Sequence, residues 1–388
     1  MTVDPDSTEE AALRAEIAGW MAEHAAPYGR SARHDRMHDD GDFAGRARTW
    51  QRTLDEGGWG AVQWPVEFGG RGFSPNQARI FREEQARYAL PIGMSMVALT
   101  MVGPTLMVHG TPEQQQLLAS IRSGEHLWCQ LFSEPDAGSD LASLRTRAEL
   151  DGDEWVVQGQ KVWTSGAATA DWGILIARTD PASKQHQGIT YFLVDMRSPG
   201  IEVRPIVQIN RARHFNEVRL DGVRIPAANV VGEVGEGWKV TRTTLGSERA
   251  AIGSMDLGPR VRAVIAAAQR NGPVDDALRL DLVDAWVRSE VLRLTSERVM
   301  AAVRSGGAPG PEGSVLKLGL SLFVGRLGDL AMRAGGAEVL LEGEGPDGYG
   351  ELQDLFLSQW SQKIGGGTEQ MSRNMISERV LGLPRDVR

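Results

Sequence analysis

The spacing of apolar residues changes twice along this chain, and that change limits the folds it can adopt. From about residue 7 to 124 apolar residues recur every three or four positions, as in amphipathic helices. From about 128 to 231 they form short runs between turn residues, typical of strands, and from about 237 the helical spacing returns. This order predicts an α+β multidomain fold: an N-terminal α-helical domain (1–125), a middle antiparallel β-barrel or sandwich (126–235) and a C-terminal four-helix bundle (236–388).

Local signals place the first helices. Ser7 followed by Glu10 is a capping-box pattern, so we expect a helix to begin there. Gly57 and Gly58 end a helix that includes Trp50. Further helices are predicted at Ala78–Tyr88, as a buried helix at the Met-rich segment Met94–Val108, and after Thr111.

The middle region contains strand-like runs without long helices between them, which argues against a doubly wound dinucleotide-binding fold. The predicted strands are 155–159, 173–177, 189–194, 201–204 and 216–220. The helices predicted for the final bundle are centred on 241–251, 260–270, 278–305 and 315–334.

Composition narrows the class of protein. The chain has 51 acidic and 42 basic residues and a formal net charge of −9, so nothing attracts it as a whole to nucleic acid or an anionic membrane. Its single cysteine, Cys129, excludes an internal disulfide and a thiolate cluster. The seven histidines show no metal-ligand spacing; His34 and His38 lie in a charged stretch that we interpret as solvated surface. The longest apolar stretch is interrupted, and the start is acidic and polar, so we expect a cytoplasmic protein with no membrane span.

Three segments carry residues suited to cofactor chemistry. In FSEPDAGSD, Gly138 and Ser139 can offer backbone N–H groups and a hydroxyl to a phosphate or a flavin edge; the alternative is a simple turn. In GQKVWTSG, Trp163 can lay its ring against a planar cofactor while a neighbouring hydroxyl donates a hydrogen bond, although strand tryptophans also serve as core. In GGGTEQ, a glycine loop precedes a helix and forms an anion site or a flexible connector.

Taken in order, these segments resemble the acyl-CoA dehydrogenase family over nearly the whole chain. FSEPDAGSD is similar to the family's TEPGAGSD signature, and GQKVWTSGA is similar to its second signature. GGWGAVQWPVEFGGRG, GITYFLVDMRSPGIEVRP, FNEVRLDGVRIPAANVVGEVGEGW and GGGTEQMSRNMISERVLGLPRD also match the family's pattern. The resemblance implies a bacterial flavoprotein of fatty acid or lipid degradation that converts an acyl-CoA to a 2-enoyl-CoA with FAD as cofactor.

The resemblance also implies roles for individual residues. Trp163 would cover one flavin face, and Ser165 would donate near flavin N5. Ser139, Arg249 and Gly366 would contact the substrate; Arg249 could instead form a structural ion pair. The residues assigned to FAD are Phe132, Ser133, Gly138, Ser139, Trp163, Ser165, Thr368 and Gln370.

The position of the catalytic base departs from the commonest pattern. Most members carry a glutamate two residues before the threonine of the glycine loop, where this chain has Gly366. A minority branch carries the glutamate on the first bundle helix, directly before an arginine, and LGSER supplies Glu248 and Arg249 at that place. The resemblance therefore implies that Glu248 takes the α-proton and that the Gly366 N–H stabilises the thioester oxygen. A surface carboxylate paired with Arg249 or Arg242 is the alternative for Glu248.

Two further points bear on partners and substrate. The cross-subunit FAD contacts of many members are replaced here by AQRNG (268–272) and by Met332 before Gly335–Gly336. We therefore expect a homo-oligomeric dehydrogenase, dimer or tetramer, or a poorly catalytic subunit of a heterotetramer; an oxidase or monooxygenase on the same fold is a third alternative. The resemblance implies an electron-transfer flavoprotein as acceptor. Several apolar side chains could line an acyl pocket or simply pack the core: Met94, Met96, Leu99, Met101 and Met107.

Overall fold

A computed structural model describes residues 7–29, 42–253, 257–304, 312–341 and 349–385. The chain divides into two compact units, Met1–Thr244 and Leu245–Arg388, and each is described by itself. Helix α7 (Gly237–Gly253) begins in the first unit and ends in the second. In the part of the chain that the structure describes, no helix is long and apolar enough to cross a membrane.

The first unit opens with helices, as predicted. They are α1 (Thr8–His24), α2 (Phe43–Glu56), α3 (Pro75–Gln85), α4 (Gly103–His109), α5 (Pro112–Gln115) and α6 (Leu117–Arg122). The Ser7 hydroxyl accepts the Glu10 N–H and the Glu10 carboxylate accepts the Ser7 N–H, so the predicted capping box is confirmed. The helices pack around a core that contains Ile17, Trp50 and Ile80.

The helix predicted over Met94–Val108 is confirmed for residues 96–109, but it is neither regular nor buried throughout. A π-helical turn, Ala98–Val102, precedes α4, and the Met96 and Val108 side chains are exposed. Pro104 has no N–H to donate, so the helical ladder cannot run unbroken through this segment. The Trp64 indole N–H donates to the Leu99 carbonyl at 2.8 Å and so satisfies an acceptor within the π turn.

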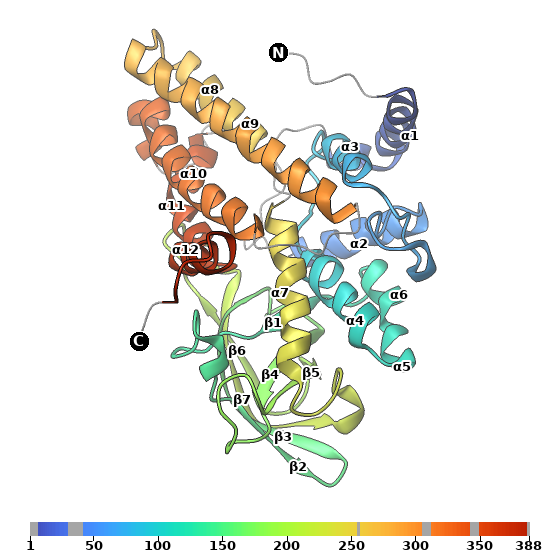
Figure 1. Cartoon of the computed structure of the whole chain (residues 1–388). Helices are drawn as coiled ribbons and strands as arrows, with labels where there is room; N and C mark the ends of the chain where they lie inside the picture. The colour runs from blue at the N-terminus through green and yellow to red at the C-terminus, as the bar shows by residue number, and fades with distance from the viewer. Residues whose placement is uncertain (1–6, 30–41, 254–256, 305–311, 342–348, 386–388) are drawn as a thin grey trace. The chain divides into compact units, whose positions relative to one another are not determined.

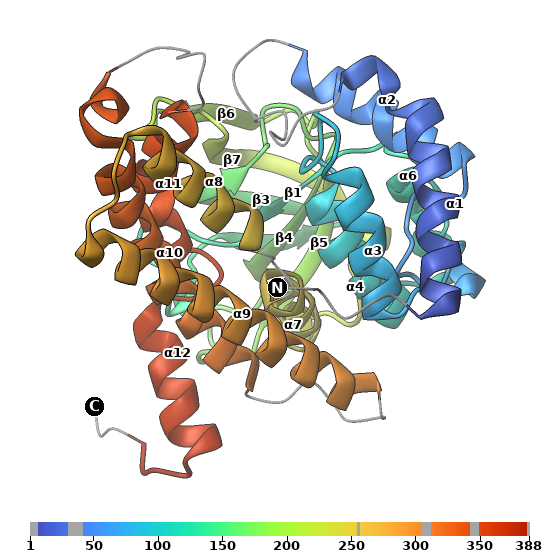
Figure 2. The same ribbon diagram turned by 90° about the horizontal axis from the view of Figure 1, so that it is seen from above.

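The middle region forms one seven-stranded sheet. Its strands are β1 (Trp128–Leu131), β2 (Arg147–Asp151), β3 (Glu154–Ser165), β4 (Trp172–Arg178), β5 (Ile189–Asp195), β6 (Ile201–Ile206) and β7 (Phe215–Pro226). The order is β1-β4-β2-β3-β7-β6, and β5 pairs with β4. Most pairs are antiparallel as predicted, but β1 and β2 each run parallel to β4. Figures 1 and 2 show helices α1–α6 gathered to one side of this sheet.

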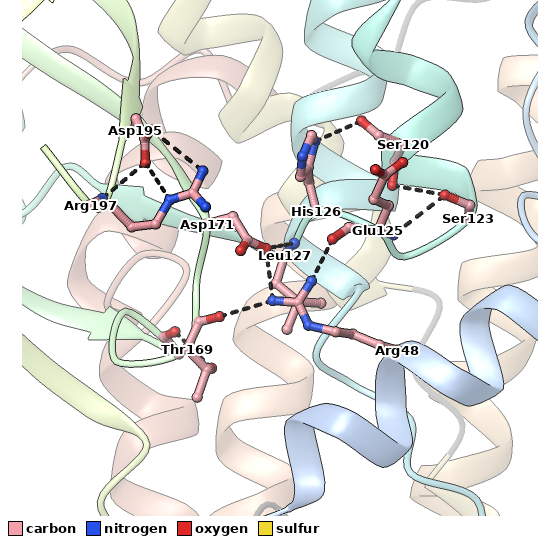
Figure 3. Close-up of polar contacts among 11 residues, drawn as sticks. Arg48, Ser120, Ser123, Glu125, His126, Leu127, Thr169, Asp171, Asp195 and Arg197 are labelled. Atoms are coloured by element: carbon pink, nitrogen blue, oxygen red, sulfur yellow. Dashed lines mark hydrogen bonds and ion pairs between the residues drawn. The ribbon is translucent and has the colours of Figure 1, made fainter.

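An arginine joins the helical and β parts of the first unit. Arg48 on α2 donates to the Asp171 carboxylate at 2.7 Å and to the Glu125 carbonyl at 2.5 Å (Figure 3). The same Asp171 carboxylate accepts the Leu127 N–H at 2.8 Å, at the entry to β1. Asp171 therefore fixes the start of β1 and the start of β4 to one helix.

The second unit is helical. Besides the end of α7 it contains α8 (Gly258–Arg270), α9 (Asp276–Arg304), α10 (Glu312–Gly335), α11 (Tyr349–Ile364) and α12 (Glu369–Met375). Its core is supplied by α8, α9, α10 and α11, with Val264, Phe323 and Leu355 among the buried residues. The bundle is confirmed, but α11 was not predicted, and α7 supplies no described residue to this core.

Candidate active site

A β-bulge on β3 presents the Trp163 side chain. Lys161 pairs with Val218 and Thr164 with Asn216, so Val162 and Trp163 lie opposite a single residue of β7. Trp163 adopts φ 62°, a left-handed backbone that large side chains rarely adopt, and its side chain is 59% exposed. A large ring held in the open by a strained backbone is suited to cover a planar ligand.

The neighbouring groups complete this surface. The Phe215 ring meets the Trp163 ring edge-on, with centroids 6.1 Å apart. Ser165 lies half-buried at the end of β3, opposite Phe215 on β7. The next residue, Gly166, donates its N–H to the His214 carbonyl at 2.8 Å.

The FSEPDAGSD segment lies beside the bulge. The Val162 N–H donates to the Ser133 carbonyl at 2.9 Å, so residues predicted to bind one cofactor do meet in the first unit. Phe132 is buried and Ser133 half-buried, whereas Gly138 and Ser139 are exposed. A Cβ on Gly138 would meet no protein atom within 4 Å, so open space surrounds this backbone.

These residues fit a flavin. Within the described residues, the hydroxyls of Ser133, Ser139 and Ser165 make no hydrogen bond to protein and remain able to donate. Trp163 lies two residues before Ser165 on β3, and its neighbour Val162 bonds the Ser133 carbonyl. A planar heterocycle with hydrogen-bond acceptors at its edge matches that set of groups.

Two buried residues behind this surface were missed from the sequence. Lys161 is 0% exposed, and its ammonium donates to the Glu134 carboxylate at 2.8 Å and to the Phe132 carbonyl at 3.0 Å. The signal was present in the alternation along β3, because Trp155, Val157 and Lys161 share the face that points into the core. Burial lowers the pKa of Lys161 to about 8, although the Glu134 carboxylate opposes that shift.

The Glu134 carboxylate has hydrogen-bond donors besides Lys161. It also accepts the N–H groups of Arg145 at 2.7 Å and Thr146 at 3.0 Å. Burial alone would raise the pKa of Glu134, but the Lys161 charge and these hydrogen bonds together lower it. The acid therefore stays ionised inside the protein.

A cluster of hydroxyls lies near Phe132 and was also missed. The Phe132 ring meets the Tyr191 ring edge-on, with centroids 5.9 Å apart. The Thr244 hydroxyl on α7 bonds the Thr105 hydroxyl at 2.8 Å and the Tyr191 hydroxyl at 3.2 Å. These bonds fix the first half of α7 against α4 and β5.

One methionine of the Met-rich segment lies near Ser165. The Met94 methyl carbon is 3.6 Å from where a Cβ on Gly166 would stand. Met94 is half-buried, whereas Met101 is buried in the core at 5% exposure. Of the proposed pocket residues, Met94 is thus beside the bulge and Met101 packs internally.

The second unit contains the candidate base and the glycine loop. Glu248 is half-buried on α7; the Arg249 side chain lies outside the described side chains, as do His34 and His38. Gly366 and Gly367 have φ values of 66° and 97°, which favour glycine. The Thr368 hydroxyl caps α12 by accepting the Met371 N–H at 3.2 Å, which leaves its proton to donate, and Gln370 is exposed.

A second buried lysine lies between these two segments. Lys317 on α10 is 4% exposed and donates to the Ser321 hydroxyl at 2.9 Å and to the Gln362 carbonyl at 2.6 Å, four residues before Gly366. Burial lowers the pKa of Lys317, while the charges of Glu369 and Glu248 oppose that shift. Glu248 is therefore close enough to Lys317 for their charges to interact. The described residues contain no group of His, Cys, Asp and Glu side chains that could hold a metal.

Family models match all three regions of the chain. They describe the N-terminal (residues 7–125), middle (129–223) and C-terminal (235–381) domains of acyl-CoA dehydrogenase. Acyl-CoA dehydrogenase IpdE1 of Mycobacterium tuberculosis is 39% identical over 97% of this chain and 98% of its own length.

Solved structures agree. A variant of the Tcur3481–Tcur3483 steroid acyl-CoA dehydrogenase has a TM-score of 0.85 and 31% identity, covering 98% of this chain and 100% of that one. The ChsE4–ChsE5 complex of Mycobacterium tuberculosis has a TM-score of 0.82 and 27% identity, covering 99% and 100%. This chain belongs to the acyl-CoA dehydrogenase family and is an oxidoreductase.

Proposed function

We propose that this enzyme binds FAD and removes the α-proton and a β-hydrogen from an acyl-CoA thioester to give a 2-enoyl-CoA. The observation that carries the proposal is the Trp163 bulge, with its exposed ring and the unengaged hydroxyls beside it. Bound FAD would supply the oxidant that takes up the β-hydrogen with its two electrons.

Glu248 is the proposed base. An α-proton beside a thioester is weakly acidic, so the base must be ionised before substrate arrives. The Glu248 carboxylate interacts with the charge of Lys317, which places a cation near the proposed base. Gly366 has no side chain that could act as a base. Its backbone N–H is the proposed donor to the thioester oxygen as negative charge develops there.

The remaining assignments follow the same segments. Trp163 would lie against the flavin ring, with Ser165 and Ser133 donating to its edge. Thr368 and Gln370 would bind other parts of FAD, and Gly138 and Ser139 would approach its phosphates. Ser139 and Arg249 are the proposed contacts to the CoA ester.

The acyl group is proposed from the similar proteins. One similar solved structure is a steroid acyl-CoA dehydrogenase, so a polycyclic acyl-CoA is the first substrate class to test. Met94, whose methyl group lies beside Gly166, is the proposed contact to the acyl group. An electron-transfer flavoprotein is the proposed acceptor.

Anaerobic bleaching of bound flavin tests the reaction. The purified protein should show flavin absorption bands that bleach when polycyclic, branched or straight-chain acyl-CoA thioesters are added. Glu248→Gln should keep the flavin but slow bleaching by about 10²- to 10⁴-fold, the usual contribution of a general base. Glu369→Gln, the same change at the other carboxylate acting on Lys317, should alter the rate little. Near-normal bleaching by Glu248→Gln refutes the base assignment.

The second candidate function is an enzyme that needs a partner subunit to bind flavin, and an exposed apolar surface on α9 favours it. Five residues of α9 are each more than half exposed and recur every three or four positions: Leu280, Val283, Val287, Val291 and Leu294. Such a stripe is typical of a helix that packs against another chain. Two similar structures are complexes of two named chains, so we propose a related subunit as the occupant. A colourless chain that acquires flavin only when a related subunit is co-expressed would favour this candidate over a homo-oligomer.

A further inference from the structure

Lys161 joins two segments that the proposed function assigns to one flavin. It precedes the bulge on β3, and its ammonium reaches the Phe132 carbonyl and the Glu134 carboxylate in the turn after β1. Both charged side chains are inside the protein, at 0% and 7% exposure. An ammonium has three donors that can be aimed at separate acceptors, so one side chain can hold a carbonyl and a carboxylate together.

Glu134 extends this connection to a third segment. The N–H groups of Arg145 and Thr146, which precede β2, donate to its two carboxylate oxygens. The Glu134 N–H and carbonyl are both paired with Ala137, which closes the SEPDA turn on itself. The backbone on either side of Ser133 is thereby fixed.

The fixed turn after β1 also determines the conformation of the bulge on β3. Val162 has left the ladder with β7, and its N–H donates instead to the Ser133 carbonyl. That redirected bond accompanies the left-handed backbone of Trp163 and the exposure of its ring. If the Ser133 carbonyl moved, Val162 would lose its acceptor, and the strained conformation would lose a contact that the flanking pairs with β7 do not replace.

We propose that Lys161 is a positioning residue that clamps the Phe132–Glu134 turn and, through the Val162–Ser133 bond, holds Trp163 in the orientation that receives the flavin. This proposal rests on the proposed function for its ligand, but the clamp itself does not require the ligand. A buried pair adds little net stability over apolar residues of similar size, so stability alone does not account for charges at these positions.

The test compares Lys161→Met with Lys184→Met, the same change at an exposed lysine between β4 and β5. We expect Lys161→Met to speed hydrogen exchange of the Val162 amide by at least about tenfold, because its acceptor is no longer fixed. FAD should bind about tenfold more weakly, and its absorption bands should shift as the Trp163 ring moves. Lys184→Met should change none of these properties.

A double variant separates positioning from stability. Lys161→Met/Glu134→Gln leaves no unpaired buried charge and keeps a carbonyl acceptor for one of the Arg145 and Thr146 N–H groups. We expect its unfolding free energy to recover while Val162 exchange stays fast and FAD binding stays weak. Recovery of all three properties together would show that Lys161 acts only on stability and would overturn the proposal.

The two proposals can fail separately. If the unaltered protein binds no FAD, alone or with a related subunit, the proposed function fails, while Val162 exchange still tests the clamp. If the unaltered protein binds FAD and Lys161→Met leaves FAD affinity, spectrum and Val162 exchange unchanged, the clamp is wrong and the proposed function stands.

Discussion

The sheet and the helical bundle each contain one buried lysine, and the two are held differently. The chain has only five lysines, at 161, 184, 239, 317 and 363, among 42 basic residues. Lys161 in the sheet bonds a carboxylate and a carbonyl, whereas Lys317 in the bundle bonds a hydroxyl and a carbonyl. Each holds the main chain next to a proposed cofactor or substrate segment, but only Lys161 has a hydrogen-bonded countercharge among the described residues.

That difference indicates how much each lysine should contribute to the stability of the fold. An ion pair in the core couples two residues, because removing either leaves the other charged and unsolvated. Lys317 has neutral hydrogen-bond partners, so its removal breaks no hydrogen-bonded ion pair, although Glu248 and Glu369 lose an interacting charge. The sheet site should therefore respond to substitution more strongly than the bundle site.

The largest effect is expected from Glu134→Ala. It leaves the Lys161 ammonium buried without a countercharge, and the free energy of unfolding should fall by about 3–5 kcal/mol. Denaturant unfolding measures it, with Glu149→Ala as the control, since Glu149 pairs with Arg147 at the surface of the same sheet. If Glu134→Ala lowered the free energy of unfolding no more than Glu149→Ala does, the proposed difference between Lys161 and Lys317 would be wrong.

A smaller effect is expected from Lys317→Met. The change removes two hydrogen bonds, but Ser321 still donates to the Gln362 carbonyl at 3.2 Å. The free energy of unfolding should fall by about 1–2 kcal/mol in the same assay. A loss equal to that of Glu134→Ala would mean that the interactions of Lys317 with Glu248 and Glu369 count as much as a hydrogen-bonded ion pair.

The smallest predicted effect is a change in the free energy of unfolding at alkaline pH. The pKa of Lys161 is about 8 in the folded protein against an ordinary 10.5, so the unfolded chain binds more protons between those values. The contribution of Lys161 to the free energy of unfolding should thus rise with pH in this window, by about 1 kcal/mol from pH 8 to pH 9. The difference between the unaltered protein and Lys161→Met, followed across these pH values, measures that rise. A difference that stays constant from pH 8 to pH 9 would contradict it.

Much of the fold followed from local patterns. The Ser7 capping box and most strands could be predicted because their signals lie within a few residues. The parallel pairing of β1 with β4 could not, because a four-residue strand does not specify its partner. The Leu99 carbonyl in the π turn accepts from Trp64, a residue more than thirty positions away, which local patterns do not reveal.

Part of the candidate site could likewise be predicted from the sequence, and part could not. Trp163, Ser133 and Glu248 were predicted from motifs, and the bond between Val162 and Ser133 brings two of those motifs together. Lys161 and Lys317 were missed because lysine usually indicates solvated surface. Apart from Ser321, which lies four residues from Lys317, their partners lie 27 or more residues away along the chain, so only the folded structure reveals them.

The left-handed turn at Gly366 bears on how readily this protein could be re-engineered at that position. With φ at 66°, a glutamate introduced there would carry a steric penalty of roughly 1–2 kcal/mol before it did any chemistry. Transferring the proposed base from α7 to position 366 would therefore need compensating changes in the loop besides the exchange of one residue. The backbone at this position favours a glycine and leaves a carboxylate to be supplied by another segment.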